Sequence, residues 1–226
     1  MSIKLLVCAA TDLELAACLP DLNAHHFPPG NPVAFGSIAV LITGVGIPAA
    51  LSSAQSACNT LLPEAVVNVG IAGAYPDAGL ALGDVVAVAS DIYGDIGFEL
   101  PDDALFRPLS TTEFGNLSIY NQFQLETNSP WIVSRQERPV RCVAACTVNQ
   151  CTGTDATGRL RAKLFSAQIE TMEGAAVAQA SAAVGVPLTQ IRAISNIAGH
   201  RSITRESIEN ALSSLEEYFR ALSPLG

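Results

Sequence analysis

Three polar residues with chemically useful side chains adjoin apolar segments of the sequence. Glu14 follows the first apolar run, Glu173 precedes a stretch of small residues, and Asn196 ends a later apolar run. A carboxylate can act as a general base or accept hydrogen bonds, and a carboxamide offers both a donor and an acceptor. Ligand groups often gather where the strands of an α/β sheet end. These three side chains are therefore candidates for a binding or catalytic site.

Each candidate also has a purely structural interpretation. Residues 11–14 form a T-x-x-E capping box, in which Glu14 would only bind an N–H group at a helix start. Glu173 could pair with Arg192 or with helix-start amides, because a carboxylate is costly to bury without donors. Asn196 could cap the turn after its strand. The residue types alone leave both interpretations open.

Short apolar runs alternate with Ala-rich helical stretches along most of the chain, which is typical of βαβ units and a largely parallel sheet. The helix predicted at residues 172–184 has almost no polar face and must be buried, whereas the helix near 208–222 is amphipathic and should lie outside. Another helix is predicted at 48–60, after a proline suited to its first turn. Strands are predicted at residues 3–9, 37–43, 65–69, 84–89, 140–146 and 188–195.

Between residues 94 and 139 the alternation dissolves into Pro, Asp, Thr and Asn with scattered aromatic residues. Irregular segments of this length are uncommon in compact domains and usually have a function. We expect a long excursion or an oligomer contact here. With 226 residues and no repeat or low-complexity tract, the chain is expected to form one α/β domain.

Composition excludes several classes of protein. Hydrophobic residues make up 49% of the chain, but no run approaches the roughly 18 apolar residues that span a bilayer. A net charge of -9 disfavours binding to nucleic-acid phosphates. The six cysteines include no C-x-x-C pair, so we expect free thiols in the cytoplasm. The spacing of Cys142, Cys146 and Cys151 does not match a zinc site, and neither a metal ion nor a cofactor is expected.

One motif suggests a dinucleotide site. Residues 44–49 satisfy G-x-G-x-x-A between a predicted strand and a helix, and Glu64 lies at about the distance of a ribose-binding acid. However, that acid should end the next strand, whereas Glu64 precedes it. A binding protein that uses this turn stays open as a non-enzymatic alternative, and the glycines can also let the backbone approach another ligand.

Five segments, taken in order, resemble the nucleoside phosphorylase and nucleosidase superfamily, which contains methylthioadenosine nucleosidase. They cover nearly the whole chain and are Ala10-Thr11-Asp12-Leu13-Glu14, Thr43-Gly44-Val45-Gly46, Asn68-Val69-Gly70-Ile71-Ala72-Gly73, Glu170-Thr171-Met172-Glu173-Gly174-Ala175-Ala176 and Arg192-Ala193-Ile194-Ser195-Asn196. Residues 192–201, with 147–149 and 93–97, look most like the futalosine hydrolase family, whose members release hypoxanthine during menaquinone biosynthesis. The resemblance implies a three-layer α/β/α fold with a mixed, largely parallel and partly barrel-like sheet, usually in a homodimer or larger homo-oligomer.

The resemblance also implies roles for individual residues. Glu14 would be the general base that activates water, and Glu173 would accept ribose hydroxyls. Met172 would lie against the sugar, although it could equally be core packing. Asn196 would contact O6 and the protonated N7 of a 6-oxopurine, where 6-aminopurine nucleosidases have Asp. Other expected pocket residues are Thr43, Gly44, Ile71, Ala72, Gly73, Val148 and Asn149. Arg201 could meet the carboxylate of futalosine's benzoate arm, or it could equally be a solvated surface residue.

Water is favoured over phosphate as the nucleophile. A phosphorolytic enzyme would need basic residues near the first strand, whereas residues 9–19 contain none and Glu14 would repel the anion. The Gly-rich segment 43–46 keeps some capacity to bind an anion, so phosphorolysis stays open. Cleavage of methylthioadenosine or S-adenosylhomocysteine is the other enzymatic alternative. The expected partner is a small-molecule nucleoside, with no nucleic acid and no membrane.

Overall fold

The apolar runs form one mixed sheet, with the strands in the order β10-β9-β5-β11-β4-β1-β3-β2. The computed structural model describes residues 2–20, 27–99, 106–108, 122–125, 140–199 and 203–222. Most neighbouring strands run parallel, but β5 is antiparallel to β11, and β2 to β3. The bounds are β1 Leu5–Ala9, β2 Val33–Phe35, β3 Ile38–Ile42, β4 Ala65–Ala74, β5 Val85–Tyr93, β9 Arg141–Thr147, β10 Ile169–Thr171 and β11 Leu188–Ile197.

One half of the sheet closes on itself. The first half of β4 pairs with β1, while its last residues, Gly73 and Ala74, pair with β10. Because β10 also pairs with β9, the strands β4, β11, β5, β9 and β10 form a closed ring. The expected partly barrel-like sheet is confirmed. The point where β1 leaves β4 opens a space beside the middle of β4.

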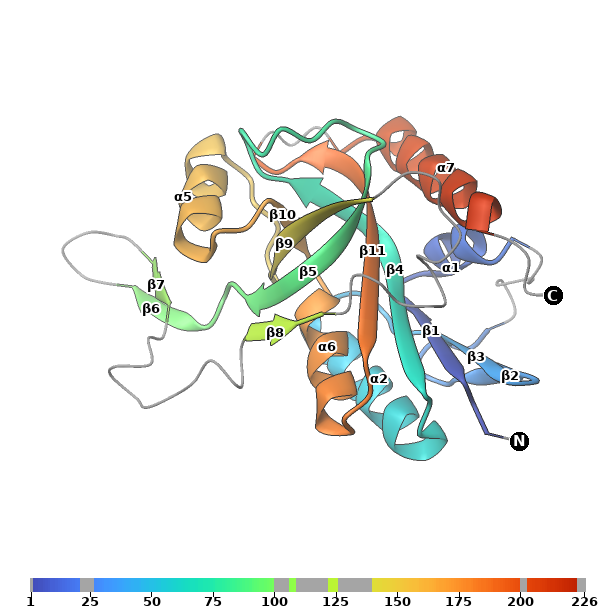
Figure 1. Ribbon diagram of the computed structural model, residues 1–226. Coiled ribbons are helices and arrows are strands. Elements are labelled where there is room, and N and C mark those ends of the chain that lie inside the picture. The colour runs from blue at the N-terminus through green and yellow to red at the C-terminus, as the bar shows by residue number, and fades with distance from the viewer. Residues whose placement is uncertain are drawn as a thin grey trace.

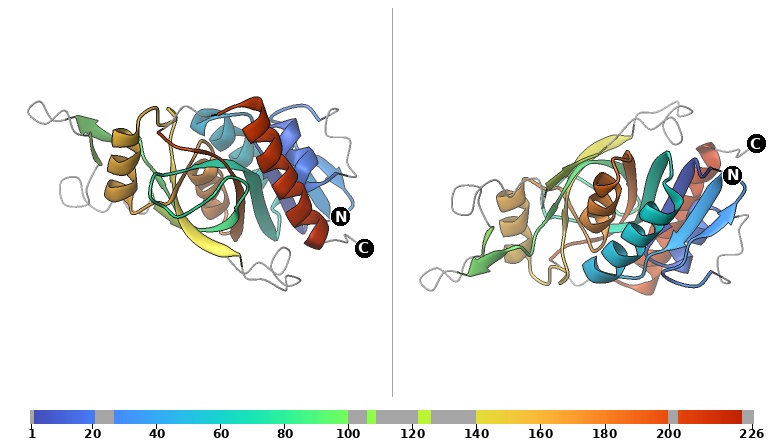
Figure 2. Two further views of the ribbon diagram at one scale, coloured as in Figure 1. Left: turned by 90° about the horizontal axis from the view of Figure 1, so that it is seen from above. Right: turned by 90° about the horizontal axis from the view of Figure 1, so that it is seen from below.

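Helices cover both faces of the sheet, as the three-layer prediction requires. Along β1, Leu5 and Val7 pack into the core beneath α1 and α7, whereas Leu6 and Cys8 pack into the core beneath α2 and α6. Figure 2 shows α7 nearest the viewer from above and α2 nearest from below. Each buried Leu or Val side chain contributes about 1.5–3 kcal/mol. The bounds are α1 Asp12–Cys18, α2 Ile47–Leu61, α5 Asp155–Phe165, α6 Gly174–Ala183 and α7 Arg205–Leu222.

The two contrasting helix predictions are confirmed. Helix α6 is buried along almost its whole length, and α7 directs Ala211, Leu215 and Tyr218 inward from an otherwise more exposed surface. Outside the region from 94 to 139, four elements have no counterpart among the predicted segments: α1, α5, β2 and β10. The apolar pattern of α1 and β10 is too short to show a period, and α5 presents a mainly polar surface. Strands β4 and β5 run past their predicted ends.

Little of the region from 94 to 139 lies within the described residues. Strands β6 (Gly97–Glu99) and β7 (Phe106–Pro108) form an antiparallel pair, and β8 (Gln122–Gln124) pairs antiparallel with the last part of β5 (Figure 1). The expected oligomer contact stays a prediction. Among the described helices, none combines the length and the apolar character needed to cross a membrane.

The packing at the start of α6 gives a test of the fold. A Cβ atom at Gly174 would lie 2.0 Å from Asp91 Oδ2 and 2.7 Å from Gln190 Oε1. We expect Gly174→Ala to lower the free energy of unfolding by about 1–3 kcal/mol or more, because overpacking forces buried groups apart. Urea denaturation would measure this loss. Gly153→Ala is the control, since a Cβ there meets nothing within 4 Å, and equal effects in both variants would contradict the prediction.

Candidate active site

A cavity of about 300 Å³ lies where β1, the middle of β4 and the ends of β10 and β11 meet. It contains seven of the residues predicted from the sequence, namely Glu14, Ile71, Ala72, Gly73, Met172, Glu173 and Asn196. They come from four separate segments of the chain. The rest of its wall is formed by Ala10, Thr11, Leu13, Val45, Cys151, Glu170, Thr171, Ser195, Ile203, Ile208 and Leu212.

Glu14 both caps a helix and faces the cavity, so its two interpretations do not exclude each other. Its Oε2 accepts the N–H (3.0 Å) and the hydroxyl (2.9 Å) of Thr11, which completes the capping box of α1. Its Oε1 accepts the N–H of Ile71 at 3.0 Å. Because each carboxylate oxygen has two lone pairs, Oε1 keeps one for a further donor. The capping box holds the carboxylate in place without using that lone pair.

Arg192 lies beside Glu14, although from the sequence it was expected only as a possible partner of Glu173. Its side chain is completely buried, and within the described residues its Nε and Nη1 atoms have no hydrogen-bond partner. A Cβ atom at Gly70 would lie 2.2 Å from Arg192 Nη1 and 2.5 Å from Glu14 Oε1. The missing side chain of Gly70 therefore lets a guanidinium donor and a carboxylate acceptor approach each other. An arginine within the apolar run 188–194 was the available sequence signal.

Glu173 is held by the glycine turn that resembled a dinucleotide motif. Its Oε1 accepts the N–H of Gly46 at 2.9 Å, across 127 residues of sequence. Gly44 and Gly46 both have positive φ, at 80° and 89°, which non-glycine residues rarely adopt. The turn aims a backbone amide at a buried carboxylate. That contact explains the G-x-G pattern by a role within the protein's own structure.

Burial raises the pKa of Glu173. Loss of solvent disfavours the charged form most strongly, and the negative charge of Glu14 acts in the same direction. Arg192 and the Gly46 N–H act the opposite way. Glu14 and Glu173, two of the three carboxylates that line the cavity, thus share one nearby guanidinium, that of Arg192.

Asn196 occupies a bulge at the end of β11. The pairing of β11 with β4 shifts register between Ile194 and Asn196, and the Asn196 carboxamide lies over Gly73. The hydroxyl of Ser195 lies 2.9 Å from Asn196 Oδ1 and 3.2 Å from the Ala72 carbonyl. With Oδ1 accepting from that hydroxyl, Nδ2 and one lone pair of Oδ1 remain available to a ligand.

Five predicted site residues are not among those that line this cavity. Thr43 is buried, and its hydroxyl is within hydrogen-bond distance of the Ala9 and Gly44 carbonyls. Val148 is also buried, while the backbone of Asn149 binds Asp95. Arg201 lies outside the described residues. Contacts of Thr43, Gly44, Val148, Asn149 and Arg201 with a ligand stay predictions.

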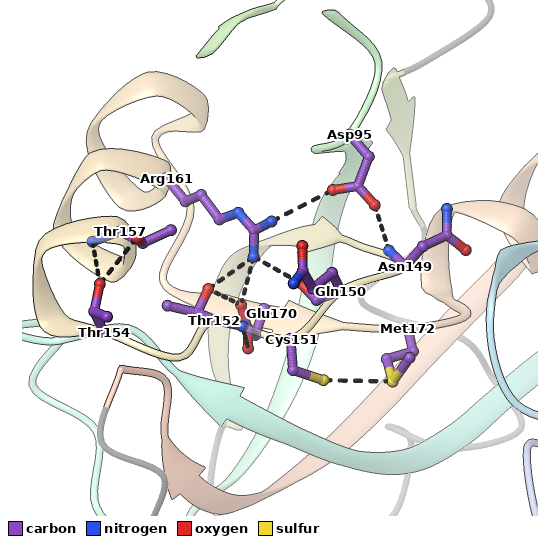
Figure 3. Close-up of polar contacts among 10 residues, drawn as sticks. All are labelled: Asp95, Asn149, Gln150, Cys151, Thr152, Thr154, Thr157, Arg161, Glu170 and Met172. Atoms are coloured by element: carbon purple, nitrogen blue, oxygen red, sulfur yellow. Dashed lines mark hydrogen bonds and ion pairs between the residues drawn. The ribbon is translucent and has the colours of Figure 1, made fainter. Parts of the chain in front are cut away.

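A polar clamp fixes the loop after β9 at one wall of the cavity (Figure 3). Arg161 of α5 donates to the Gln150 carbonyl (2.9 Å) and the Thr152 hydroxyl (2.8 Å), and also pairs with Asp95 and Glu170. Glu170 accepts the N–H of Thr152 at 2.9 Å. These bonds hold the loop at both ends of Cys151.

Within this loop, Cys151 makes the contact that completes the cavity wall. Its thiol lies 3.5 Å from the sulfur of Met172, so two polarisable side chains form one surface. Both residues line the cavity. Sequence reasoning named Met172 but gave Cys151 no role here.

The open side of the cavity is apolar. Leu13, Val45 and Ile203 line it although each is more than half exposed, at 53%, 56% and 52%. Ile208 and Leu212 of α7 continue this surface. We call these five residues the apolar rim. Sequence reasoning missed it because its members come from three distant segments.

The raised pKa of Glu173 predicts a pH effect on stability. In the unfolded state Glu173 has its ordinary pKa of 4.5, and in the folded state its pKa is higher. Between these two pH values the folded protein therefore binds more protons than the unfolded protein. Stability contributed by this group therefore falls as pH rises through that interval. We expect the stability of Glu173→Gln relative to the parent protein to increase across it and then level off.

Thermal unfolding at closely spaced pH values from 4.5 upward would measure the trend. Glu209→Gln is the control, because Glu209 is exposed and pairs with Arg205 on the outer surface of α7. If the difference in stability between Glu173→Gln and the parent protein does not change with pH, Glu173 does not have a raised pKa in the folded state.

Comparisons with known proteins agree with this architecture. The model of the phosphorylase superfamily matches residues 4–223. Futalosine hydrolase from Thermus thermophilus is 30% identical, over 87% of this chain and 89% of its own, and futalosine hydrolase from Streptomyces coelicolor is 31% identical, over 91% and 84%.

Solved structures share the fold. The 5'-methylthioadenosine/S-adenosylhomocysteine nucleosidase of Helicobacter pylori superposes with a TM-score of 0.72 over 98% of both chains, at 17% identity. An identity this low speaks for the fold alone. Together with the match over residues 4–223, the sheet that closes through β4 and β10 and the cavity beside it identify the chain as a member of the phosphorylase superfamily.

Proposed function

We propose that this protein hydrolyses the N-glycosidic bond of a 6-oxopurine nucleoside, and that its substrate is futalosine, which yields hypoxanthine. One observation carries the proposal: Glu14, Glu173 and Asn196 line a single cavity although they come from distant parts of the chain. Two futalosine hydrolases at 30% and 31% identity support this choice of substrate.

At the sugar, Glu14 activates the attacking water. Hydrolysis passes through an oxocarbenium-like sugar, so water must lose a proton as it attacks the anomeric carbon. Oε1 of Glu14 has a lone pair for that proton, and Arg192 offers an unpaired N–H beside the same point at Gly70. Glu14 holds and orients the water molecule, and Arg192, which is fully buried and does not line the cavity, acts on that carboxylate from behind.

Glu173 receives the ribose hydroxyls. It is buried, and the Gly46 N–H orients its carboxylate at the cavity wall. Vicinal hydroxyls are suitable donors for such a group. Met172 next to it offers an apolar face to the sugar ring.

At the base, Asn196 recognises the 6-oxo group. Its Nδ2 donates to O6, while Oδ1 keeps a lone pair beyond the Ser195 contact for the proton that arrives at N7. A 6-amino group would instead face Nδ2 with another donor. The orientation of the carboxamide therefore supports hypoxanthine over adenine as the leaving base.

The apolar rim accommodates the substituent at the 5' end of the nucleoside. Leu13, Val45 and Ile203 expose apolar surface where the cavity opens, which favours an aromatic or alkyl group over a free hydroxyl. The benzoate arm of futalosine provides such a group. Arg201 is proposed to meet its carboxylate.

Water, rather than phosphate, suits the charges of the cavity. Among the described residues that line it, Glu14, Glu170 and Glu173 are acidic and none is basic. A phosphate dianion would have to approach these carboxylates at short range, where repulsion is strong. Arg192, a single buried charge that does not line the cavity, does not offset them.

The remaining parts of the proposal concern the setting of the enzyme. It acts in the cytoplasm, which fits its six free cysteines, and it works without a metal or cofactor. It assembles as a homodimer or a larger homo-oligomer.

A substrate panel tests the activity. We expect hypoxanthine to be released from futalosine at the same rate with and without inorganic phosphate, and faster than adenine from 5'-methylthioadenosine. Chromatographic identification of the free base would measure all three reactions. Dependence on phosphate would indicate phosphorolysis, and preferential release of adenine would refute the assignment of Asn196.

Glu14→Gln tests the general base without removing the cap. Glutamine also serves at this position of a capping box, so α1 should keep its stability. We expect kcat to fall on the order of 10²-fold or more, because an amide cannot take the proton from water. Steady-state kinetics and thermal unfolding would be compared, and near-normal turnover would return Glu14 to a capping role alone.

A further inference from the structure

A chain of buried polar groups crosses the sheet behind the cavity and is not accounted for by the reaction. Its centre is Asp91 on β5, whose exposed fraction is 0%. Asp91 does not line the cavity. A carboxylate at such a position is costly to bury, so it needs several donors and a nearby positive charge.

On one side, the chain links Asp91 to Arg192. Gln190 Nε2 donates to Asp91 Oδ2 at 2.9 Å. The other end of the same amide, Oε1, accepts from Asn68 Nδ2 at 2.8 Å and from Arg192 Nη2 at 3.2 Å. Because Gln190 donates to Asp91, its Oε1 is turned toward Arg192, whose guanidinium lies near Glu14 and Glu173.

On the other side, the chain links Asp91 to the start of α6. The hydroxyl of Thr147 donates to Asp91 Oδ1 at 2.8 Å, and it accepts the N–H of Ala175 at 2.8 Å. Since Thr147 has one proton, Thr171 must donate in their mutual 2.8 Å bond. Thr171 in turn accepts the N–H of Gly174, the residue after Glu173.

These directions form one consistent set in which every donor points toward Asp91. An ionised carboxylate is acceptor-only and matches that set. A protonated carboxyl group carries a donor, so either Gln190 or Thr147 would have to turn round. Reversal of Gln190 would place its NH₂ group against Arg192, whereas reversal at Thr147 would disturb the contacts at the start of α6.

The surroundings of Asp91 bring its pKa, and so the pH at which it becomes protonated, close to neutral pH. Burial raises its pKa to about 6, while the bonds from Gln190 and Thr147 and the charge of Arg192 act in the opposite direction. Its other titratable neighbours are Cys146 on β9 and Tyr93 on its own strand. Burial raises the pKa of both neighbours, so they are neutral in this range.

We propose that Asp91 is a positioning residue for the hydrolysis: its ionised carboxylate fixes the orientation of Arg192 through Gln190 and the start of α6 through Thr147. This inference rests on the proposed function, because it concerns the residues that hold water and ribose. Protonation of Asp91 therefore lowers turnover on the acid side without any change in the groups that touch the substrate.

The test moves the negative charge from position 91 to position 190 by exchanging the acid and the amide at these two positions. In Asp91→Asn the new NH₂ group reverses one branch, and we expect kcat with futalosine to fall by about 10-fold or more, with KM changing much less. In the double variant Asp91→Asn/Gln190→Glu, the amide at position 91 donates to the carboxylate at position 190, which again accepts from Arg192 and Asn68. We expect the double variant to recover most of the lost kcat.

The pH profile of kcat supplies a readout that a merely structural role would not change. In the double variant the carboxylate contacts Arg192 directly, so its pKa should be lower and the acid limb should move to lower pH. Asp77→Asn is the control, because this carboxylate is exposed and pairs with Arg159 away from the cavity. It should keep the parent kcat and pH profile.

The outcomes separate the two proposals. An inactive parent protein refutes the proposed function and this inference with it. An active parent with unchanged kcat and acid limb in Asp91→Asn overturns the inference alone. If Asp91→Asn does not fold, the double variant decides: a folded protein with restored kcat and a shifted limb supports the role of Asp91, and one that is folded but still impaired overturns it.

Discussion

The buried guanidinium of Arg192 is the constraint around which the site is organised. An unpaired charge is strongly unfavourable in a protein interior, so negative groups must approach it from the available directions. Glu14 and Glu173 lie toward the cavity, and the Gln190–Asp91 pair lies on the far side. Three carboxylates, contributed by α1, β5 and the start of α6, therefore lie near one positive charge.

Close approach of these polar groups requires positions without side chains. Gly70 leaves room for Arg192 and Glu14, Gly174 leaves room for Asp91, and Gly46 adopts a positive φ that presents its N–H to Glu173. Each of these glycines follows from a contact seen in the structure. A superficial match to a nucleotide-binding motif thus arises from the internal packing of polar groups.

Sequence reasoning recovered the alternation of strands and helices, because β1 and α6 carry simple apolar patterns. It also brought Glu14, Glu173 and Asn196 together, but only through their resemblance to a family. It placed the end of β4 too early, because Gly70 and Gly73 looked like strand breaks and the closure through β10 depends on distant pairing. The contact between Asp91 and Gln190 joins residues 99 positions apart, and no local pattern encodes it.

The capping box of α1 has a consequence for how the site becomes ready for its substrate. Thr11, three residues away, fixes the carboxylate of Glu14, so its orientation is set by local chain folding and does not wait for a ligand. Little reorganisation energy then remains to be supplied when a nucleoside enters. The same arrangement links function to helix nucleation. Substitutions that weaken the first turn of α1 would lower the activity of the enzyme before they unfold the protein.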